Sequence, residues 1–198
     1  MNILSQFTAR RYSTRGLWSL FLICAFPLHV WTIILYLRDV SWLSERTNLW
    51  DAIGVGAYGL LYAFVESLLA FIGVALLGLF LTPKGWTVEK RISFLSLLVL
   101  ILSIWGMIAQ LLFLWKVFPP AWIVELLIRW GRPLLGLYLI SLSFVVPSVV
   151  LPVYLFLRSD RTTRAIQEFS ERLSPLMTAY LFLDLAGLIV VIIRNAAM

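Results

Sequence analysis

Five long apolar runs constrain the fold of this 198-residue chain more than any other feature. Each run has about 20 residues or more, which is the length that an α-helix needs to cross the hydrocarbon core of a bilayer. The expected spans are residues 16–37, 53–81, 92–115, 133–157 and 175–193. Five such spans leave no room for a soluble domain. We therefore predict an all-α, polytopic helical membrane protein with a single transmembrane domain, residues 1–198.

The composition agrees with a membrane protein and excludes an ordinary soluble domain. Hydrophobic residues make up 62% of the chain and charged residues only 13%, against about half and a quarter in soluble proteins. The formal net charge is +6, but the basic residues are dispersed over short loops and no nucleic-acid recognition module is present. We expect the partner of these charges to be the lipid bilayer and not a nucleic acid.

Two short segments outside the spans are amphipathic. In residues 121–132, one helical face carries Glu125, Arg129 and Arg132, and the other carries Ile123, Leu126, Leu127 and Trp130. A helix of this length is too short to span, so its pattern predicts a helix lying at the membrane surface, with a re-entrant hairpin as the alternative. Residues 160–174 show a similar pattern, and Pro175 is expected to separate them from the last span.

The distribution of Lys and Arg predicts the orientation of the chain. The N-terminal arm and the loops at 82–91 and 158–174 carry ten of these residues, whereas the loops at 38–50 and 116–132 and the C-terminal tail carry six. Because cytoplasmic loops are enriched in Lys and Arg, we expect the N-terminus inside and the C-terminus outside a cell membrane of the cytoplasmic type.

Two acidic residues lie near the middle of predicted spans, and they are the first candidates for function. Glu66 interrupts the run 53–81, and Asp184 lies near the centre of the run 175–193. An ionised carboxylate at the bilayer centre costs roughly 2.5–3.5 kcal/mol on insertion scales, so each should face protein or water. At similar depths the two side chains are expected to share a site, either a proton or cation pathway or a polar pocket. The structural alternative is that each is neutralised and only fixes helix packing.

Small residues flank Glu66 at helical spacing. Gly59, Ala63, Ala70 and Gly73 lie three, four or seven positions from it and share its side of the helix. Small side chains allow a second helix to approach closely, so this side is predicted to be a helix-packing face.

The remaining polar candidates are His29, Gln110, Tyr62 and Tyr180, each within a predicted span. Gln110, Tyr62 and Tyr180 are expected to hydrogen-bond the intramembrane acids or to line a polar pocket, and His29 is expected to be a hydrogen-bonded packing residue, with a proton shuttle as the alternative. His29 is the only histidine, so a bis-histidine haem is excluded and a single-histidine pigment or haem site is disfavoured. No cluster of Cys, His, Asp or Glu has the spacing of a metal site. The sequence thus predicts no cofactor and no metal.

These features favour a non-catalytic role. We expect an accessory or structural subunit of a larger membrane assembly, bound to other membrane subunits or to further copies of itself through the small-residue side of residues 53–81. The alternative is a small proton- or cation-coupled transporter or channel that uses Glu66 and Asp184. An intramembrane enzyme acting on lipid is the third possibility, although no nucleophile lies in a recognisable motif.

Overall fold

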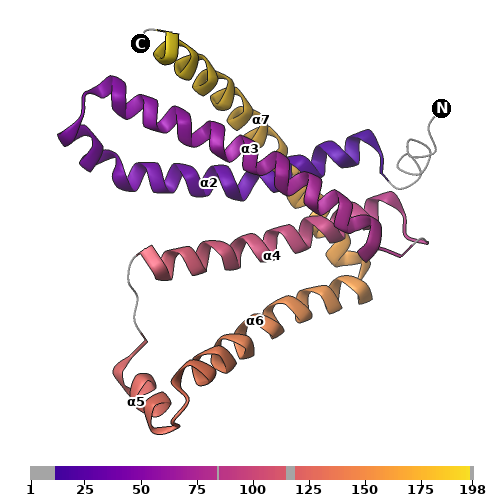
Figure 1. Cartoon of the computed structure of the whole chain (residues 1–198). Coiled ribbons are helices and arrows are strands. Elements are labelled where there is room, and N and C mark those ends of the chain that lie inside the picture. The colour runs from indigo at the N-terminus through magenta and orange to yellow at the C-terminus, as the bar shows by residue number, and fades with distance from the viewer. Residues whose placement is uncertain (1–11, 84, 115–118, 197–198) are drawn as a thin grey trace.

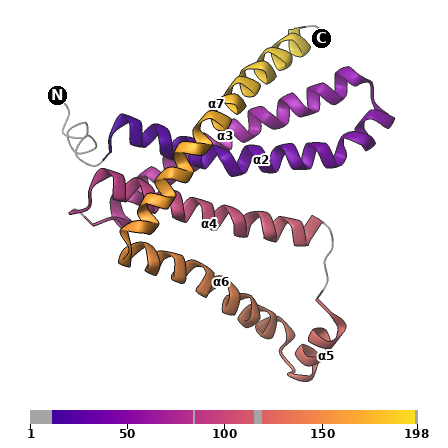
Figure 2. The same ribbon diagram turned by 180° about the vertical axis from the view of Figure 1, so that it is seen from behind.

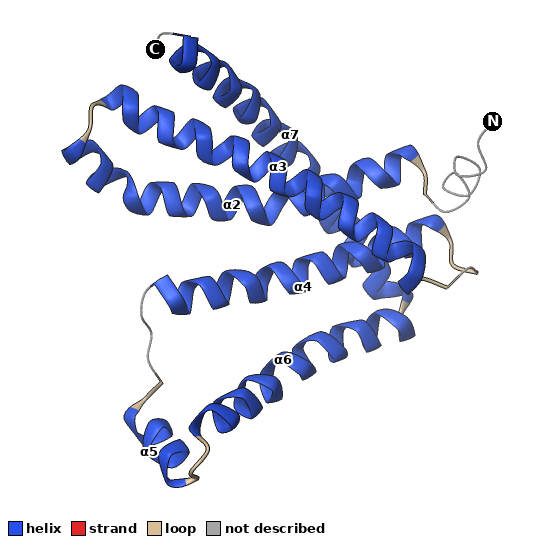
Figure 3. Ribbon diagram, in the orientation of Figure 1, coloured by secondary structure: helices blue, strands red, loops and turns tan. Residues whose placement is uncertain are grey.

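The described residues of the computed structural model, 12–83, 85–114 and 119–196, form six helices and no strand (Figures 1 and 3). The helices are α2 (Thr14–Arg46), α3 (Leu49–Leu81), α4 (Val88–Leu114), α5 (Ala121–Arg129), α6 (Pro133–Arg158) and α7 (Asp160–Ala196). All but α5 are long and apolar enough to cross a membrane. The predicted all-α fold with five spans is confirmed. Arg10, Arg11, Lys84 and Trp115, which contributed to the sequence interpretation, lie outside the described residues.

Successive long helices run in alternate directions, so the start of α2 and the end of α7 lie at opposite ends of the bundle (Figures 1 and 2). The start of α2 and the α3–α4 and α6–α7 connections lie at one end, which we call the amino-terminal end. The α2–α3 turn, α5 and the end of α7 lie at the other, the carboxy-terminal end. This alternation is typical of a multi-pass membrane protein with an odd number of spans.

Helix α2 is the centre of the packing. It contacts α3, α4 and α7, and its segment from Leu20 to Ala25 is almost completely buried. Leu20 packs with Leu95 of α4, and Leu22 packs with Met177 of α7. Apolar side chains of α2 therefore hold three other helices together at the amino-terminal half of the bundle.

Helix α6 packs much less closely. Within the described part of the chain it contacts α4, α5 and α7 only, and most of its apolar side chains are exposed, as expected for a lipid-facing surface. Pro147 and Pro152 predict that its second half is bent or partly unwound; α6 is one continuous helix, so the unwinding is not found. A hydrogen bond of 2.7 Å from Trp105 Nε1 to Ser148 Oγ links α6 to α4.

Helix α7 corrects a second expectation. Residues 160–174 and the last span are one helix of 37 residues that continues through Pro175. Proline lacks an N–H, so the carbonyl of Glu171 loses its helical partner. Glu171 and Pro175 are both exposed near the amino-terminal end, where water or headgroups can hydrogen-bond the freed carbonyl. The amphipathic segment is thus the first part of α7.

The other amphipathic segment does form a separate short helix, α5. It packs against the start of α6, where Leu127 and Trp130 lie beside Gly136. Leu127 is buried in this contact, whereas Leu126 and Trp130 remain more than half exposed. The apolar side of α5 is therefore divided between α6 and the surroundings of the chain.

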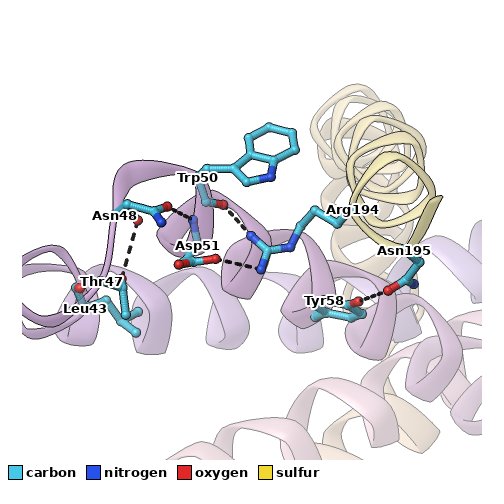
Figure 4. A network of polar contacts seen from close by, with 8 residues as sticks. All are labelled: Leu43, Thr47, Asn48, Trp50, Asp51, Tyr58, Arg194 and Asn195. Carbon is cyan, nitrogen blue, oxygen red and sulfur yellow. Dashed lines mark hydrogen bonds and ion pairs between the residues drawn. The ribbon is translucent and has the colours of Figure 1, made fainter. Parts of the chain in front are cut away.

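A polar cluster joins α3 to α7 at the carboxy-terminal end (Figure 4). Arg194 donates one hydrogen bond to the carbonyl of Trp50, at 2.7 Å, and forms an ion pair with Asp51, at 2.8 Å. The hydroxyl of Tyr58 donates to Asn195 Oδ1 at 3.1 Å. The last turn of α7 is therefore tied to the first turns of α3.

Candidate functional site

A buried histidine–carboxylate pair links α2 to α7 in the interior of the bundle. His29 Nε2 lies 3.0 Å from Asp184 Oδ1 and 2.9 Å from Asp184 Oδ2. His29 is 0% exposed and Asp184 is 5% exposed. Polar groups at such depth are stable only when they are hydrogen-bonded. The pair therefore satisfies two groups that would each be costly alone.

The second ring nitrogen of His29 fixes the arrangement of protons. Nδ1 lies 2.8 Å from the backbone carbonyl of Ala25. A carbonyl oxygen only accepts, so Nδ1 must carry a hydrogen and donate it. One proton is then shared between Nε2 and the carboxylate, either as imidazolium with carboxylate or as neutral imidazole with carboxylic acid. The hydrogen-bond network thus assigns a pair with no net charge and one transferable proton.

Tyr180 completes this site. Its ring stacks on the imidazole of His29 with centroids 5.8 Å apart and an angle of 5° between the planes. It lies four positions before Asp184 on α7, so the two side chains leave the same face of that helix. The stacking restricts rotation of the imidazole and keeps Nε2 directed at Asp184. His29, Tyr180 and Asp184 are the three sequence candidates that the structure brings together.

The geometry limits the chemistry of His29. Both ring nitrogens already have partners in the chain, so neither lone pair is available to act as a general base on a substrate or to coordinate a haem or pigment. Among the described residues there is also no group of three or more His, Cys, Asp or Glu that could hold a metal ion. The arrangement is suited to holding a proton and to joining two helices.

Glu66 does not belong to this site. It lies on the exposed side of α3, and Tyr62, one turn earlier on the same side, is 70% exposed. Glu66 therefore does not face the interior of the chain, and the expectation that it shares a site with Asp184 is wrong. The reason is the direction in which each side chain leaves the helix. Ala63 and Ser67, on the adjacent face of α3, are each 0% exposed and point into the bundle, so Glu66 points away from it.

Gln110 is also outside the site. It is exposed near the end of α4, where this helix has diverged from the others (Figure 1). Near the start of the same helix Ser96 is 0% exposed. Both residues belong to the apolar run of α4, so membership of that run does not predict whether a polar side chain is buried.

The predicted packing face of α3 is only partly correct. Ala63 is 0% exposed, and Gly59 faces Thr32 of α2, so these two pack inside the chain. Ala70 is exposed, and nothing lies within 4 Å of the position that a Cβ on Gly73 would take. The face therefore passes from the interior to the outside of the bundle along α3.

A groove of about 640 Å³ opens between α2, α3 and α7 and reaches Asp184. Its walls include Phe21 of α2, Phe64 of α3 and Leu181 of α7, and Asp184 is the only charged residue in its described lining. A mostly apolar groove with a few polar groups is the usual form of a small-molecule or acyl-chain site. The buried pair is thus adjacent to a space that a ligand can enter.

A scan against protein-family models, a search of curated proteins and a search of solved structures each found no match for this chain.

Sequence reasoning identified the members of the site but missed their pairing. His29 and Asp184 are both polar residues within apolar runs, which is the signal that selected them. Their partner choice depends on the crossing of α2 and α7, helices that are separated by more than 100 residues in the chain. A single sequence contains no signal for that crossing.

Proposed function

We propose that this chain is a non-catalytic subunit of a larger membrane assembly, and that a partner binds the exposed side of α3 around Glu66. The observation that carries the proposal is that Glu66 lies near the middle of a 33-residue apolar helix and is exposed. An ionised carboxylate facing lipid at that depth costs roughly 2.5–3.5 kcal/mol. A polar side chain from another helix would remove this cost.

The chemistry of Glu66 indicates the kind of partner. A carboxylate accepts hydrogen bonds and attracts positive charge, so the best complement is a transmembrane helix with Lys, Arg or His at the same depth. A second copy of this chain has no Lys or Arg within the five apolar runs predicted from the sequence, and its His29 is already hydrogen-bonded to Asp184. A different membrane protein is therefore the better occupant.

The exposed side of α3 also allows a close approach. Ala70 and Gly73 lie beside Glu66 on the side where the chain places no other helix. Small residues let two backbones come near each other, which strengthens van der Waals contact and interhelical hydrogen bonds. The proposed contact thus combines the carboxylate of Glu66 with small side chains that let a second helix approach closely.

Photo-crosslinking in native membranes tests this function. Tyr62, one turn from Glu66 and on the same side of α3, is replaced by a photoreactive phenylalanine derivative. The expected product is a discrete adduct with one other membrane protein, whose crosslinked span carries Lys, Arg or His. The adduct should be lost when Glu66→Leu is added. Phe144 of α6, 67% exposed, provides the matched control position and should give no such adduct.

The proposal is contradicted if Tyr62 crosslinks only to lipid or to a second copy of the chain. It is also contradicted if Glu66→Leu leaves the adduct unchanged while the protein is correctly inserted.

For the orientation we propose the N-terminus inside and the C-terminus outside, on the ten-to-six distribution of Lys and Arg. Reporter fusions at both ends, which should lie on opposite sides, measure this directly.

Proton- or cation-coupled transport is the second candidate, because His29 and Asp184 share one transferable proton beside a groove. In this case the working acid is Asp184, and Glu66 is not part of the pathway. Reconstituted vesicles with a pH-sensitive dye inside are the assay. Asp184→Asn should abolish proton flux, and Glu66→Gln should leave it unchanged. The transport candidate is rejected if wild-type vesicles take up no protons under an imposed potential.

A further inference from the structure

A polar cavity lies at the amino-terminal end of the bundle, apart from the histidine–carboxylate pair. It has a volume of about 580 Å³ and lies between α2, α4 and α7. Six serines line it, at positions 13, 19, 93, 96, 170 and 174. The cavity is formed by the first turns of α2 and α4, where lipid headgroups meet the spans of a membrane protein. Its lining is suited to a polar ligand at headgroup depth.

Ser96 is a buried residue of this lining whose hydroxyl is not used by the rest of the described chain. It is 0% exposed, and its hydroxyl has no hydrogen-bond partner among the described residues. Ser93, one turn earlier, donates its hydroxyl to the carbonyl of Glu89 at 2.9 Å. A buried hydroxyl without a partner is unfavourable. An oxygen-rich or nitrogen-bearing ligand in the cavity would satisfy it.

The charged residues of the cavity define the headgroup that fits. In the described lining, Arg15 contributes one positive charge, and Glu89 and Glu171 contribute one negative charge each. Arg15 and Glu171 lie 3.7 Å apart at the rim, and both side chains are largely exposed, so a ligand can separate them. The guanidinium complements a phosphate, and the carboxylates complement an ammonium group that donates hydrogen bonds.

This charge distribution also excludes other headgroups. An anionic headgroup would place further negative charge beside two carboxylates, which is unfavourable. A quaternary ammonium donates no hydrogen bonds and is usually held in a cage of several aromatic rings. Trp18 is the only aromatic residue in the described lining of the cavity. A headgroup with one phosphate and one primary amine is therefore the best match.

The apolar groove supplies a place for an acyl chain. Trp18 lines both the polar cavity and the groove, so the two spaces meet at this residue. Along α3 the groove extends from Phe71 to Leu61, which is about 15 Å of helix. That is half the thickness of a bilayer core, or one leaflet. A lipid with its headgroup in the cavity would direct a chain toward Asp184.

We infer that this chain binds a phospholipid with a primary-amine headgroup, with the headgroup among the serines and one acyl chain in the groove. The site uses none of the residues on the exposed side of α3 that the proposed partner contacts. A failure of this inference therefore leaves the proposed function standing, and the reverse also holds.

Native mass spectrometry of the whole chain in mild detergent tests the inference. Dioleoyl phosphatidylethanolamine, the corresponding phosphatidylcholine and the corresponding phosphatidylglycerol are titrated in parallel, with inorganic phosphate as a separate arm. We expect the ethanolamine lipid to bind one per chain and about tenfold more tightly than either of the others. Phosphate alone should not bind, because it lacks both the amine and the chain.

Substitutions in the polar cavity and in the apolar groove test whether the lipid occupies both. Arg15→Gln should weaken binding of the ethanolamine lipid by about tenfold, which corresponds to loss of a charge-assisted hydrogen bond. Leu181→Trp fills the groove and should weaken it at least as much, whereas Leu151→Trp on the exposed side of α6 should have no effect. Ser96→Ala, a substitution small enough to leave the fold intact, should weaken it several-fold.

Three results would overturn the inference. They are equal affinity for all three lipids, binding of phosphate alone with the same dependence on Arg15, and unchanged binding in Leu181→Trp. Circular dichroism of each variant establishes that the helices are retained, so that a loss of binding is not a loss of fold.

Discussion

Asp184 and Glu66 are similar in sequence and opposite in structure. Both are acids in the middle of apolar runs. Asp184 is 5% exposed and lies 2.9 Å from His29, whereas Glu66 is exposed on α3. The two acids differ in the direction of their side chains and not in their position along the helix. Successive residues of a helix are rotated by about 100°, so a shift of one position can turn a side chain from the interior to the outside. An intramembrane acid thus indicates a polar contact, and its orientation decides whether the contact lies inside the chain or with a partner.

This comparison assigns different consequences to the two residues. Loss of Asp184 should damage the chain itself, because His29 would remain buried without its partner. Loss of Glu66 should leave the chain folded and affect only the assembly. The predictions that follow test this division, beginning with the largest expected effect.

The largest effect is expected for Asp184→Leu. It leaves His29 Nε2 buried without its hydrogen-bond partner, which should lower the free energy of unfolding by about 3 kcal/mol. Asp184→Asn retains a side chain that can hydrogen-bond the imidazole and should cost less. Unfolding of the detergent-solubilised protein, followed by circular dichroism during a titration with sodium dodecyl sulfate, measures both. Equal stability of Asp184→Leu and the wild type would show that the pair contributes nothing.

A smaller effect is expected for Gly187→Leu. Gly187 lies one turn after Asp184, and a Cβ there would be 3.3 Å from the carbonyl oxygen of Ala57 on α3. A leucine must push α3 and α7 apart, which should cost about 1–3 kcal/mol. The matched control is Gly73→Leu, where no atom lies within 4 Å and the free energy of unfolding should be unchanged. Similar losses for both glycines would contradict the packing described here.

Arg194→Met should have a modest effect. The guanidinium joins α7 to Trp50 and Asp51 at the carboxy-terminal end, where part of the contact is exposed and therefore weakened by solvent. We expect a loss of about 1 kcal/mol. Hydrogen exchange of the last turns of α7 should increase in this variant, while that around His29 should not change. Increased exchange throughout α7 would show that the cluster controls the whole helix.

The smallest effect on stability is expected for Glu66→Leu. An exposed apolar residue should leave the free energy of unfolding of the isolated chain within about 0.5 kcal/mol of the wild type. The same variant should lose the photo-crosslinked partner. A marked destabilisation of the isolated chain would mean that Glu66 has a contact within the chain.

Much of the fold could be predicted from the sequence, because hydrophobic runs of helical length leave few alternatives in a bilayer. The errors occurred where a helix could continue. Pro175 was expected to end a helix, but the exposed carbonyl of Glu171 tolerates the missing N–H. Pro147 and Pro152 likewise lie inside one helix. Proline limits local geometry, and its surroundings decide whether the helix breaks.

The site was predictable only as a set of candidates. His29, Tyr180 and Asp184 were selected because polar groups are rare in apolar spans. Glu66, Gln110 and Tyr62 were selected by the same reasoning and are exposed. What separates the two groups is the tertiary arrangement of α2 and α7, which brings residues 155 positions apart into contact. Periodicity within one helix cannot encode that contact.

A double-mutant cycle tests the central claim, that Asp184 is paired with His29 and not with Glu66. The free energy of unfolding is measured for His29→Leu, Asp184→Leu, Glu66→Leu and the double variants that include Asp184→Leu. We predict an interaction energy of at least about 1 kcal/mol between His29 and Asp184, and additivity within about 0.5 kcal/mol for Glu66 and Asp184. Additivity for His29 and Asp184, or coupling between the two acids, would contradict the account.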